Sequence, residues 1–271
     1  MANIPLEDSY TDIIGKAMRG LRLDETGLAS QAGVSIPELQ ALLAGEFSSA
    51  TAARITPWLG LNSTALTALA EKRYAPADVT LEGLAMFNTP FEDMTVNAFL
   101  VWDPATKDAA VFDTGADASG ILAEAHSRVL TIKHIFITHT HGDHIFDLDR
   151  LREKTGAEVW SCERESVDGS HVFHVGKSWQ LGSLKIESRL TWGHSPGGVT
   201  YVINGLARPV AVVGDSIFAG SMGGGKVSYA DAVKNNVEQI LTLPASTVIC
   251  PGHGPLTSVG EEQRNNPFFA K

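Results

Sequence analysis

The stretch FITHTHGDHIFD, residues 136–147, places three histidines and two aspartates within twelve positions, directly behind a run of β-type residues. The whole chain of 271 residues contains only nine histidines, so this cluster is unusually dense. A packed core excludes imidazole and carboxylate groups unless they are paired, because their burial costs free energy. The pattern H-x-H-x-D-H, formed by His139, His141, Asp143 and His144, therefore indicates a binding site.

Imidazole and carboxylate side chains together suit divalent metals such as Zn, Fe, Mn or Co. The cluster lies where a predicted strand ends and a helix begins, which is where α/β sheets usually place their chemistry. Side chains alternate along an extended chain, so His139 and His141 point the same way, and the turn at Gly142 brings Asp143 and His144 to a second position. One ion takes about four ligands. Four ligands in one loop, with more elsewhere, predict two divalent ions.

Three further ligands follow other predicted strands. His194 lies in TWGHSPGG, Asp215 in VAVVGDSIFAG and His253 in VICPGHGPLT, each with glycine beside it. Taken singly each signal is weak, because an aspartate after a strand is more often a helix N-cap. The specific signal is their combination, in this order, with H-x-H-x-D-H. The other strand-end or isolated histidines are interpreted as capping or surface residues: His126, His134, His171 and His174.

These residues make the chain resemble the metallo-β-lactamase superfamily over residues 80–271, including FDTGAD ahead of the cluster and GHGPLTSVGEEQRNNPFF at the end. The resemblance implies an α/β fold of the αββα sandwich type, with the site at one edge between two mixed sheets. It implies two divalent metal ions, with zinc as the first expectation and iron or manganese as alternatives. It assigns His139, His141 and His194 to one ion, Asp143, His144 and His253 to the other, and Asp215 to both.

The spacing between the ligands is most similar to that of the glyoxalase II branch. This resemblance implies a hydrolase in which a metal-bridging hydroxide attacks the ester, thioester or lactone carbonyl of a small molecule. Asp143 would orient the nucleophile and accept its proton. One alternative keeps the ligands and changes the reaction. Persulfide dioxygenases of this superfamily use one iron, and His139, His194 and Asp215 match their facial triad.

The substrate is not fixed by these motifs. Glyoxalase II enzymes place a Lys and a Tyr shortly after the bridging Asp, where this chain has AGSMGGGKVSY with Lys226 and Tyr229 as distant candidates. They also have a Tyr two residues after the last His, where Pro255 stands here, and a C-terminal helical domain that has no counterpart in this sequence. β-Lactam hydrolysis is not expected, because a Cys commonly replaces the bridging Asp in lactamases of this fold.

The sequence divides into a helical part, residues 1–76, and a catalytic part, residues 77–271, joined near YAPADVTLEG, with Pro76 expected to end the last helix. Within the first part, LASQAGVSIPELQALLAGE resembles the helix-turn-helix of phage-repressor-type domains, and Ser35 with Glu38 forms a capping box. Ala- and Leu-rich helical patterns are expected over residues 9–21, 26–32, 36–44, 50–58 and 63–74.

A regulator that binds DNA through the helical part and senses a metabolite is the third hypothesis. Residues 1–76 carry eight acidic and six basic side chains, and the helix that would enter the major groove offers Glu38 and Gln40 but no cation. Phosphate contacts dominate DNA affinity, so nucleic acid is not an expected partner. Packing or homodimerisation through this helical part is the preferred interpretation.

The catalytic part alternates strands and helices, which predicts a layered α/β domain. Strands are predicted over residues 97–103, 109–115, 133–139, 157–162, 199–205, 208–215 and 246–252, and helices over residues 117–128 and 145–156.

Bulk properties predict a cytoplasmic enzyme with a small-molecule substrate. The net charge is −10, two cysteines lie far apart, and the first residues lack the apolar segment of a signal peptide. No apolar run approaches the roughly 20 residues of a membrane span, so no membrane association is expected.

Overall fold

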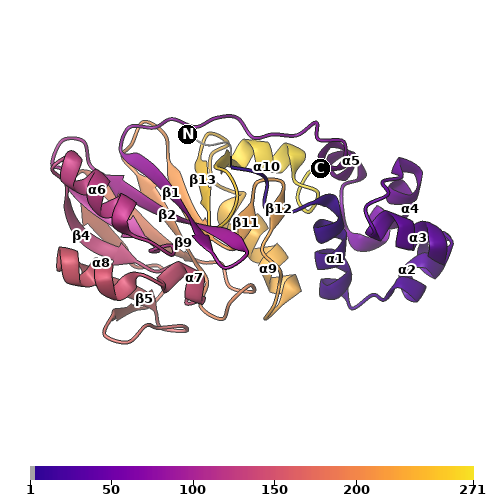
Figure 1. The fold of residues 1–271 in the computed structure, drawn as a ribbon, viewed down its shortest axis with the longest axis horizontal. Helices are drawn as coiled ribbons and strands as arrows, with labels where there is room; N and C mark the ends of the chain where they lie inside the picture. The colour runs from indigo at the N-terminus through magenta and orange to yellow at the C-terminus, as the bar shows by residue number, and fades with distance from the viewer. Residues whose placement is uncertain (1–3) are drawn as a thin grey trace.

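The computed structural model describes residues 4–271 and shows an N-terminal helical part packed against one end of a β-sandwich (Figure 1). The five helices of the N-terminal helical part are α1 (Tyr10–Leu21), α2 (Glu25–Ala32), α3 (Ile36–Leu43), α4 (Ser49–Leu59) and α5 (Ser63–Ala70). Their buried faces form one apolar core, which includes Ile14, Leu28, Leu39 and Ile55. The predicted number and order of these helices agree with the structure.

The predicted capping box at the start of α3 is present. The Ser35 hydroxyl accepts a hydrogen bond from the Glu38 backbone N–H, and the Glu38 carboxylate accepts one from the Ser35 N–H at 2.8 Å. These two bonds satisfy backbone donors that have no partner within the helix. The exposed side chains of α3 include Glu38 and Gln40, so this helix presents no cation to solvent at those positions.

The end of α5 differs from the prediction. The helix stops at Ala70 and not next to Pro76, and Lys72 adopts a left-handed φ of 55°. Beyond the helix, Tyr74 packs into the apolar core of the helical part, and its hydroxyl donates to the buried carboxylate of Glu262 at 3.0 Å. The connection between the two parts is thus anchored by a buried side chain. The domain boundary at residue 76 stays a prediction.

Two six-stranded sheets form the sandwich. The first has the order β1-β2-β3-β4-β5-β6 and the second β14-β13-β10-β9-β8-β7. The strands of the first sheet are β1 (Leu84–Phe91), β2 (Met94–Trp102), β3 (Asp108–Phe112), β4 (Thr131–Phe136), β5 (Glu158–Cys162) and β6 (His171–Phe173). Those of the second are β7 (Ser178–Leu181), β8 (Leu184–Leu190), β9 (Val199–Asn204), β10 (Val210–Gly214), β13 (Val248–Pro251) and β14 (Thr257–Ser258). A small hairpin joins β11 (Ile217–Phe218) to β12 (Ser221–Met222).

Helices cover both outer faces of the sandwich, which confirms the predicted αββα order of layers. α6 (Ser119–Ser127) and α8 (Leu148–Thr155) pack on the first sheet, and α9 (Tyr229–Asn235), the π-helical turn η1 (Asn236–Ile240) and α10 (Val259–Asn265) pack on the second. Between the sheets lies an apolar core that contains Phe99, Phe112, Phe136 and Tyr201. Burial of such large side chains is the main stabilising contribution in a sandwich of this kind.

The helix predicted over residues 145–156 is interrupted. A short helix α7 (Gly142–Ile145) carries the end of the H-x-H-x-D-H pattern, and α8 starts separately after Asp147. The Asp147 carboxylate accepts a hydrogen bond from the Ala118 N–H at 2.8 Å, which holds the break against α6. Because of the break, α7 and α8 can run in different directions, and α7 can point His144 into the protein. Within residues 4–271, no helix has both the length and the apolar character needed to cross a membrane.

Candidate metal centre

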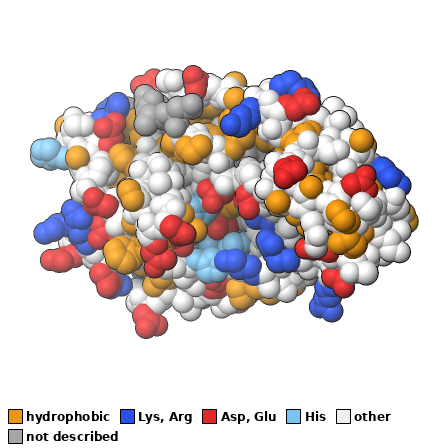
Figure 2. Space-filling model, turned by 45° about the vertical axis from the view of Figure 1, so that its right-hand side comes forward, with side chains coloured by type: hydrophobic (Ala, Val, Ile, Leu, Met, Phe, Trp, Pro, Cys, Tyr) orange, Lys and Arg blue, Asp and Glu red, His pale blue; other side chains and the backbone are white. Residues whose placement is uncertain are grey.

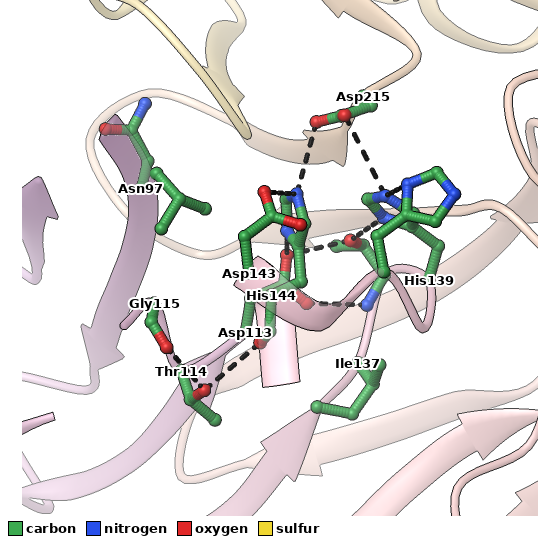
Figure 3. Close-up of polar contacts among 12 residues, drawn as sticks. Asn97, Asp113, Thr114, Gly115, Ile137, His139, Asp143, His144 and Asp215 are labelled. Carbon is green, nitrogen blue, oxygen red and sulfur yellow. Dashed lines mark hydrogen bonds and ion pairs between the residues drawn. The ribbon is translucent and has the colours of Figure 1, made fainter. Parts of the chain in front are cut away.

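All seven predicted ligands gather at one edge of the sandwich, in two groups. The first group contains His139, His141, His194 and Asp215, the second contains Asp143, His144 and His253, and within each group the candidate ligand atoms lie within 4.8 Å of one another. Figure 3 shows Asp215 above His139 and His144, with dashed contacts to both sides. The grouping matches the one that the family resemblance implied. Metal binding by these residues itself stays a prediction.

The first group has the spacing of ligands around one ion. His141 Nδ1 lies 2.9 Å from His139 Nε2 and 3.0 Å from His194 Nε2. Asp215 Oδ2 lies 3.2 Å from His194 Nε2 and 3.8 Å from His139 Nε2. Ligands bonded at 2.0–2.1 Å to a tetrahedral ion are themselves about 3.4 Å apart. These four atoms fit that arrangement.

The second group is organised around two carboxylates. Asp143 Oδ2 lies 3.4 Å from His144 Nε2 and 3.4 Å from His253 Nε2. Asp215 Oδ1 lies 3.3 Å from His144 Nε2, and its Oδ2 lies 3.4 Å from His253 Nε2. Asp215 therefore faces both groups, because its oxygens lie within 4 Å of histidine nitrogens in each of them.

Hydrogen bonds at Nδ1 fix the orientation of three histidine rings. His144 Nδ1 contacts Asp113 Oδ2 at 2.8 Å, His194 Nδ1 contacts the Gly224 carbonyl at 3.0 Å, and His253 Nδ1 contacts the Thr95 carbonyl at 2.7 Å. Because each acceptor requires a proton on Nδ1, Nε2 is the nitrogen of each ring that faces the site and that a metal ion would bind.

Two atoms of the site have no hydrogen-bond partner although they are buried. His144 Nε2 and Asp215 Oδ1 both lack a partner. A buried polar atom without a partner costs free energy, and a cation between these two atoms would remove that cost. The residues present thus fit divalent metal ions.

The pKa shifts differ between the two groups. Burial lowers the pKa of His139 well below its usual value and lowers that of His194 to about 4, so both rings are neutral and free to act as ligands. Burial opposes protonation of His144 as well, but the carboxylates of Asp113 and Asp215 outweigh it and raise the pKa to about 10. Asp215, likewise buried, is kept ionised because His144 and His253 lower its pKa. The second group therefore attracts positive charge, which a metal ion supplies as well as a proton.

Two acidic residues that the sequence motifs did not reveal support the candidate ligands. Asp113, at the end of β3, accepts hydrogen bonds from the Thr138 N–H at 2.8 Å and the Thr138 hydroxyl at 2.7 Å in addition to its contact with His144. Glu165 accepts from the Thr140 N–H at 3.0 Å and the Gly197 N–H at 2.8 Å, which ties the H-x-H loop to the loop of His194. Asp113 lies in FDTGAD, directly after a strand, and this position is the only indication of its role that the sequence offers. In the structure it adopts a left-handed φ of 55°.

The loop of His253 can approach Asp215 only because of a glycine. A Cβ on Gly252 would lie 2.2 Å from Asp215 Oδ1 and 2.7 Å from His144 Cε1, which is closer than atoms can pack. The Asn97 amide donates to the carbonyls of Pro251 and Gly254, both at 2.8 Å, and so holds this loop in place.

The four histidines interpreted as capping or surface residues, His126, His134, His171 and His174, lie outside both groups. His134, for example, accepts a hydrogen bond from the Trp160 indole at 3.3 Å on the first sheet.

Known proteins resemble this chain in sequence and in structure. A family model described as the metallo-beta-lactamase superfamily matches residues 92–253. The probable metallo-hydrolase YqgX of Bacillus subtilis is 30% identical over 210 residues, which cover 66% of this chain and 95% of YqgX. The hydroxyacylglutathione hydrolase GloC of Haemophilus influenzae is 26% identical over 198 residues, covering 64% of this chain and 92% of GloC. The crystal structure of BLEG-1, a B3 metallo-beta-lactamase, has a TM-score of 0.59 and 28% identity, covering 69% of this chain and 100% of BLEG-1.

The family match spans more than half of the chain, and the chain therefore belongs to the metallo-β-lactamase superfamily. The predicted fold and family are confirmed, and the likeness to metallo-hydrolases, GloC among them, supports a hydrolase of this superfamily. The matched range begins at residue 92, so helices α1 to α5 lie outside it.

Proposed function

We propose that the chain hydrolyses an ester, thioester or lactone carbonyl of a small molecule with two divalent metal ions, for which zinc is the first expectation. His139, His141 and His194 would hold one ion, Asp143, His144 and His253 the other, and Asp215 both. Two ions so placed would supply hydroxide near neutral pH and polarise the carbonyl that it attacks. The position of Asp215 carries this proposal, because its carboxylate faces both groups: Oδ1 lies near His144, and Oδ2 lies near His194 and His253.

The chain's own groups have separate tasks in this proposal. Asp143 lies beside His144 and His253, and its carboxylate would orient the nucleophile and accept its proton. The pKa of Asp143 is lowered from its usual value, because hydrogen bonding from His253 and the charge of His144 outweigh the opposing effect of burial. It is therefore ionised at neutral pH and available as a base. Asp113 and the carbonyls of Gly224 and Thr95 keep the ligand rings in position.

Metal analysis combined with a substrate panel tests this function. Protein purified without added metal should contain two zinc, iron or manganese ions per chain and should hydrolyse members of a panel of thioesters, lactones and aryl esters. A β-lactam belongs in the panel because BLEG-1 is a β-lactamase. The chelated protein, and the same protein after metal is restored, are the matched controls.

Two results would contradict the proposal. Hydrolysis that is unchanged after complete metal removal would exclude a metal-dependent reaction. One iron per chain, with oxygen consumption on a persulfide and no hydrolysis, would instead establish the dioxygenase alternative, in which His139, His194 and Asp215 hold the iron.

A further inference from the structure

A cleft of about 530 Å³ opens beside the metal-ligand cluster, and part of its wall comes from the N-terminal helical part. His194, Asp215 and His253 line one side, and Lys16 and Arg19 of α1 line another. This part of the wall lies outside the range matched by the family model. The helical part is therefore placed to touch whatever enters the metal centre.

The wall is held against the sandwich by a buried ionic contact. The Lys16 ammonium group contacts the Asp8 carboxylate and donates to the Met222 carbonyl at 2.9 Å. Asp8 in turn accepts a hydrogen bond from the Ser221 hydroxyl at 2.5 Å. The Lys16 side chain is only 14% exposed. Lys16 thus fixes α1 to the β12 hairpin, and its charge is already neutralised.

Close packing between α1 and α9 adds a second contact. A Cβ on Gly20 would lie 2.2 Å from the ring of Tyr229, so only glycine allows the helix to approach this far. Because α1 is attached at Lys16 and again at Gly20, the residue between these contacts that lines the cleft, Arg19, has a fixed backbone position.

Two cationic side chains that line the cleft have no acidic partner within residues 4–271. Arg19 from α1 and Lys226 from the loop before α9 both line the cleft and are exposed, and neither forms an ion pair within residues 4–271. Figure 2 shows cationic side chains beside the pale-blue histidines in the hollow at the centre of the face. Two acidic residues, Glu7 and Asp215, also line the cleft, and Glu7 lies by Gly254 in the loop of His253. Arg19 and Lys226 are therefore available to pair with an anionic group that enters the cleft.

We propose that Arg19 and Lys226 bind a carboxylate group of the substrate, so that the N-terminal helical part acts as a substrate-binding wall. The inference rests on the proposed function and narrows its substrate class to esters, thioesters or lactones that carry a free carboxylate. A guanidinium group forms two parallel hydrogen bonds to a carboxylate, and a nearby ammonium adds a third donor. The overall charge of −10 would otherwise repel such an anion, so unpaired cations at the site are significant.

Glutarate and its dimethyl ester are suitable probes of this site. Calorimetric titration of the metal-loaded protein should show that glutarate binds and that the neutral diester does not. Arg19→Gln and Lys226→Gln should each weaken glutarate binding about tenfold or more, because each removes a charge-assisted contact. Arg22→Gln is the matched control, since Arg22 caps the same helix but does not line the cleft. Equal glutarate affinity in all four proteins, or no binding of glutarate, would overturn the inference.

Hydrolysis of a matched pair of esters distinguishes a failure of the proposed carboxylate site from a failure of the proposed hydrolase function. The pair is 4-nitrophenyl hydrogen glutarate and methyl 4-nitrophenyl glutarate. Arg19→Gln should raise KM for the acid substrate, leave kcat close to that of the wild type, and leave the neutral ester unaffected. If KM for the acid is also unchanged, the carboxylate site is wrong while the hydrolase stands. If the wild type binds glutarate through Arg19 but hydrolyses no ester or thioester, the proposed function fails and the binding site stands.

Discussion

Two buried carboxylates in different regions of the molecule are surrounded in opposite ways. Glu262, where the helical part meets the sandwich, accepts hydrogen bonds from the Tyr74 and Thr257 hydroxyls, the Gly220 N–H and the Asn266 amide. Asp215, in the metal centre, has one oxygen with no hydrogen-bond partner and histidine nitrogens around it. The carboxylate with all its hydrogen bonds joins two parts of the fold, whereas the carboxylate surrounded by histidine nitrogens has the environment of a metal ligand.

Replacement of Asp215 should have the largest effect. Asp215→Ala removes the one carboxylate that faces both histidine clusters, so at least one metal ion should be lost. The rate of ester or thioester hydrolysis should fall by on the order of a thousandfold, because several kcal/mol of charge stabilisation in the transition state disappear. Metal analysis and steady-state kinetics measure the two effects. Asp149→Ala, at an exposed position of α8, is the control, and an Asp215→Ala protein with two ions and full turnover would refute the assignment.

Replacement of Asp113 should have an intermediate effect on the same centre. Asp113→Asn keeps the side chain's shape but weakens its hold on His144 Nδ1 and on Thr138. Loss of a partner behind a metal-binding histidine lowers metal affinity by about 10- to 100-fold. Competition with a chromogenic chelator measures this change. Asp117→Asn, an exposed position in the same FDTGAD segment, should leave affinity unchanged, and equal affinity in both variants would show that Asp113 does not position the site.

Ionisation of Glu262 should make the free energy of unfolding depend on pH and should leave metal binding unchanged. Burial raises the pKa of Glu262 to about 7, above its usual 4.5, although four donors oppose the shift. The folded protein therefore holds this proton more tightly than the unfolded chain. The resulting stability is present below pH 4.5 and is lost as pH rises through about 7, by about 3 kcal/mol at most.

Denaturant unfolding of the wild type and of Glu262→Gln between pH 5 and pH 8 tests this linkage. The variant should lose less stability than the wild type over that range, because it has no carboxyl group to titrate there. Parallel pH profiles for the two proteins would contradict the expected shift. Metal content should be the same in both.

The smallest effect is expected at the surface of the helical part. Ser35→Ala removes the N-cap of α3 and should lower the free energy of unfolding by about 1 kcal/mol. Hydrolytic activity should not change, because α3 lies away from the cleft wall formed by α1. Ser30→Ala, an exposed serine within α2, is the control. A fall in activity without a fall in stability would show that the segment resembling a helix-turn-helix has a role at the metal centre.

The ligand set could be predicted from sequence because its signal is local. His139, His141, Asp143 and His144 stand within six positions, Asp215 and His253 each follow an apolar strand, and His194 follows another β run. The alternation of strands and helices predicted a layered α/β domain, and the αββα order came from the resemblance to the family. Short strands such as β6 and β7 were not predicted, because three or four residues carry too little periodic pattern.

The contacts that join distant parts of the chain could not be read from the sequence. In the sequence, Asp113 is an ordinary residue after a strand and Tyr74 is the last residue of a helical pattern. Each has its role only through a partner far along the chain, His144 for Asp113 and Glu262 for Tyr74. Arg19 gave no sequence signal as a cleft residue, since its place depends on how α1 docks onto α9. Homodimerisation through the helical part stays a prediction.

Anomalous diffraction from crystals of the metal-loaded protein tests the central claim most directly. Data collected at the absorption edge of the bound metal should show two peaks, one among His139, His141 and His194 and one among Asp143, His144 and His253, with Asp215 in contact with both. A single peak, or a second peak away from Asp215, would contradict the two-ion account.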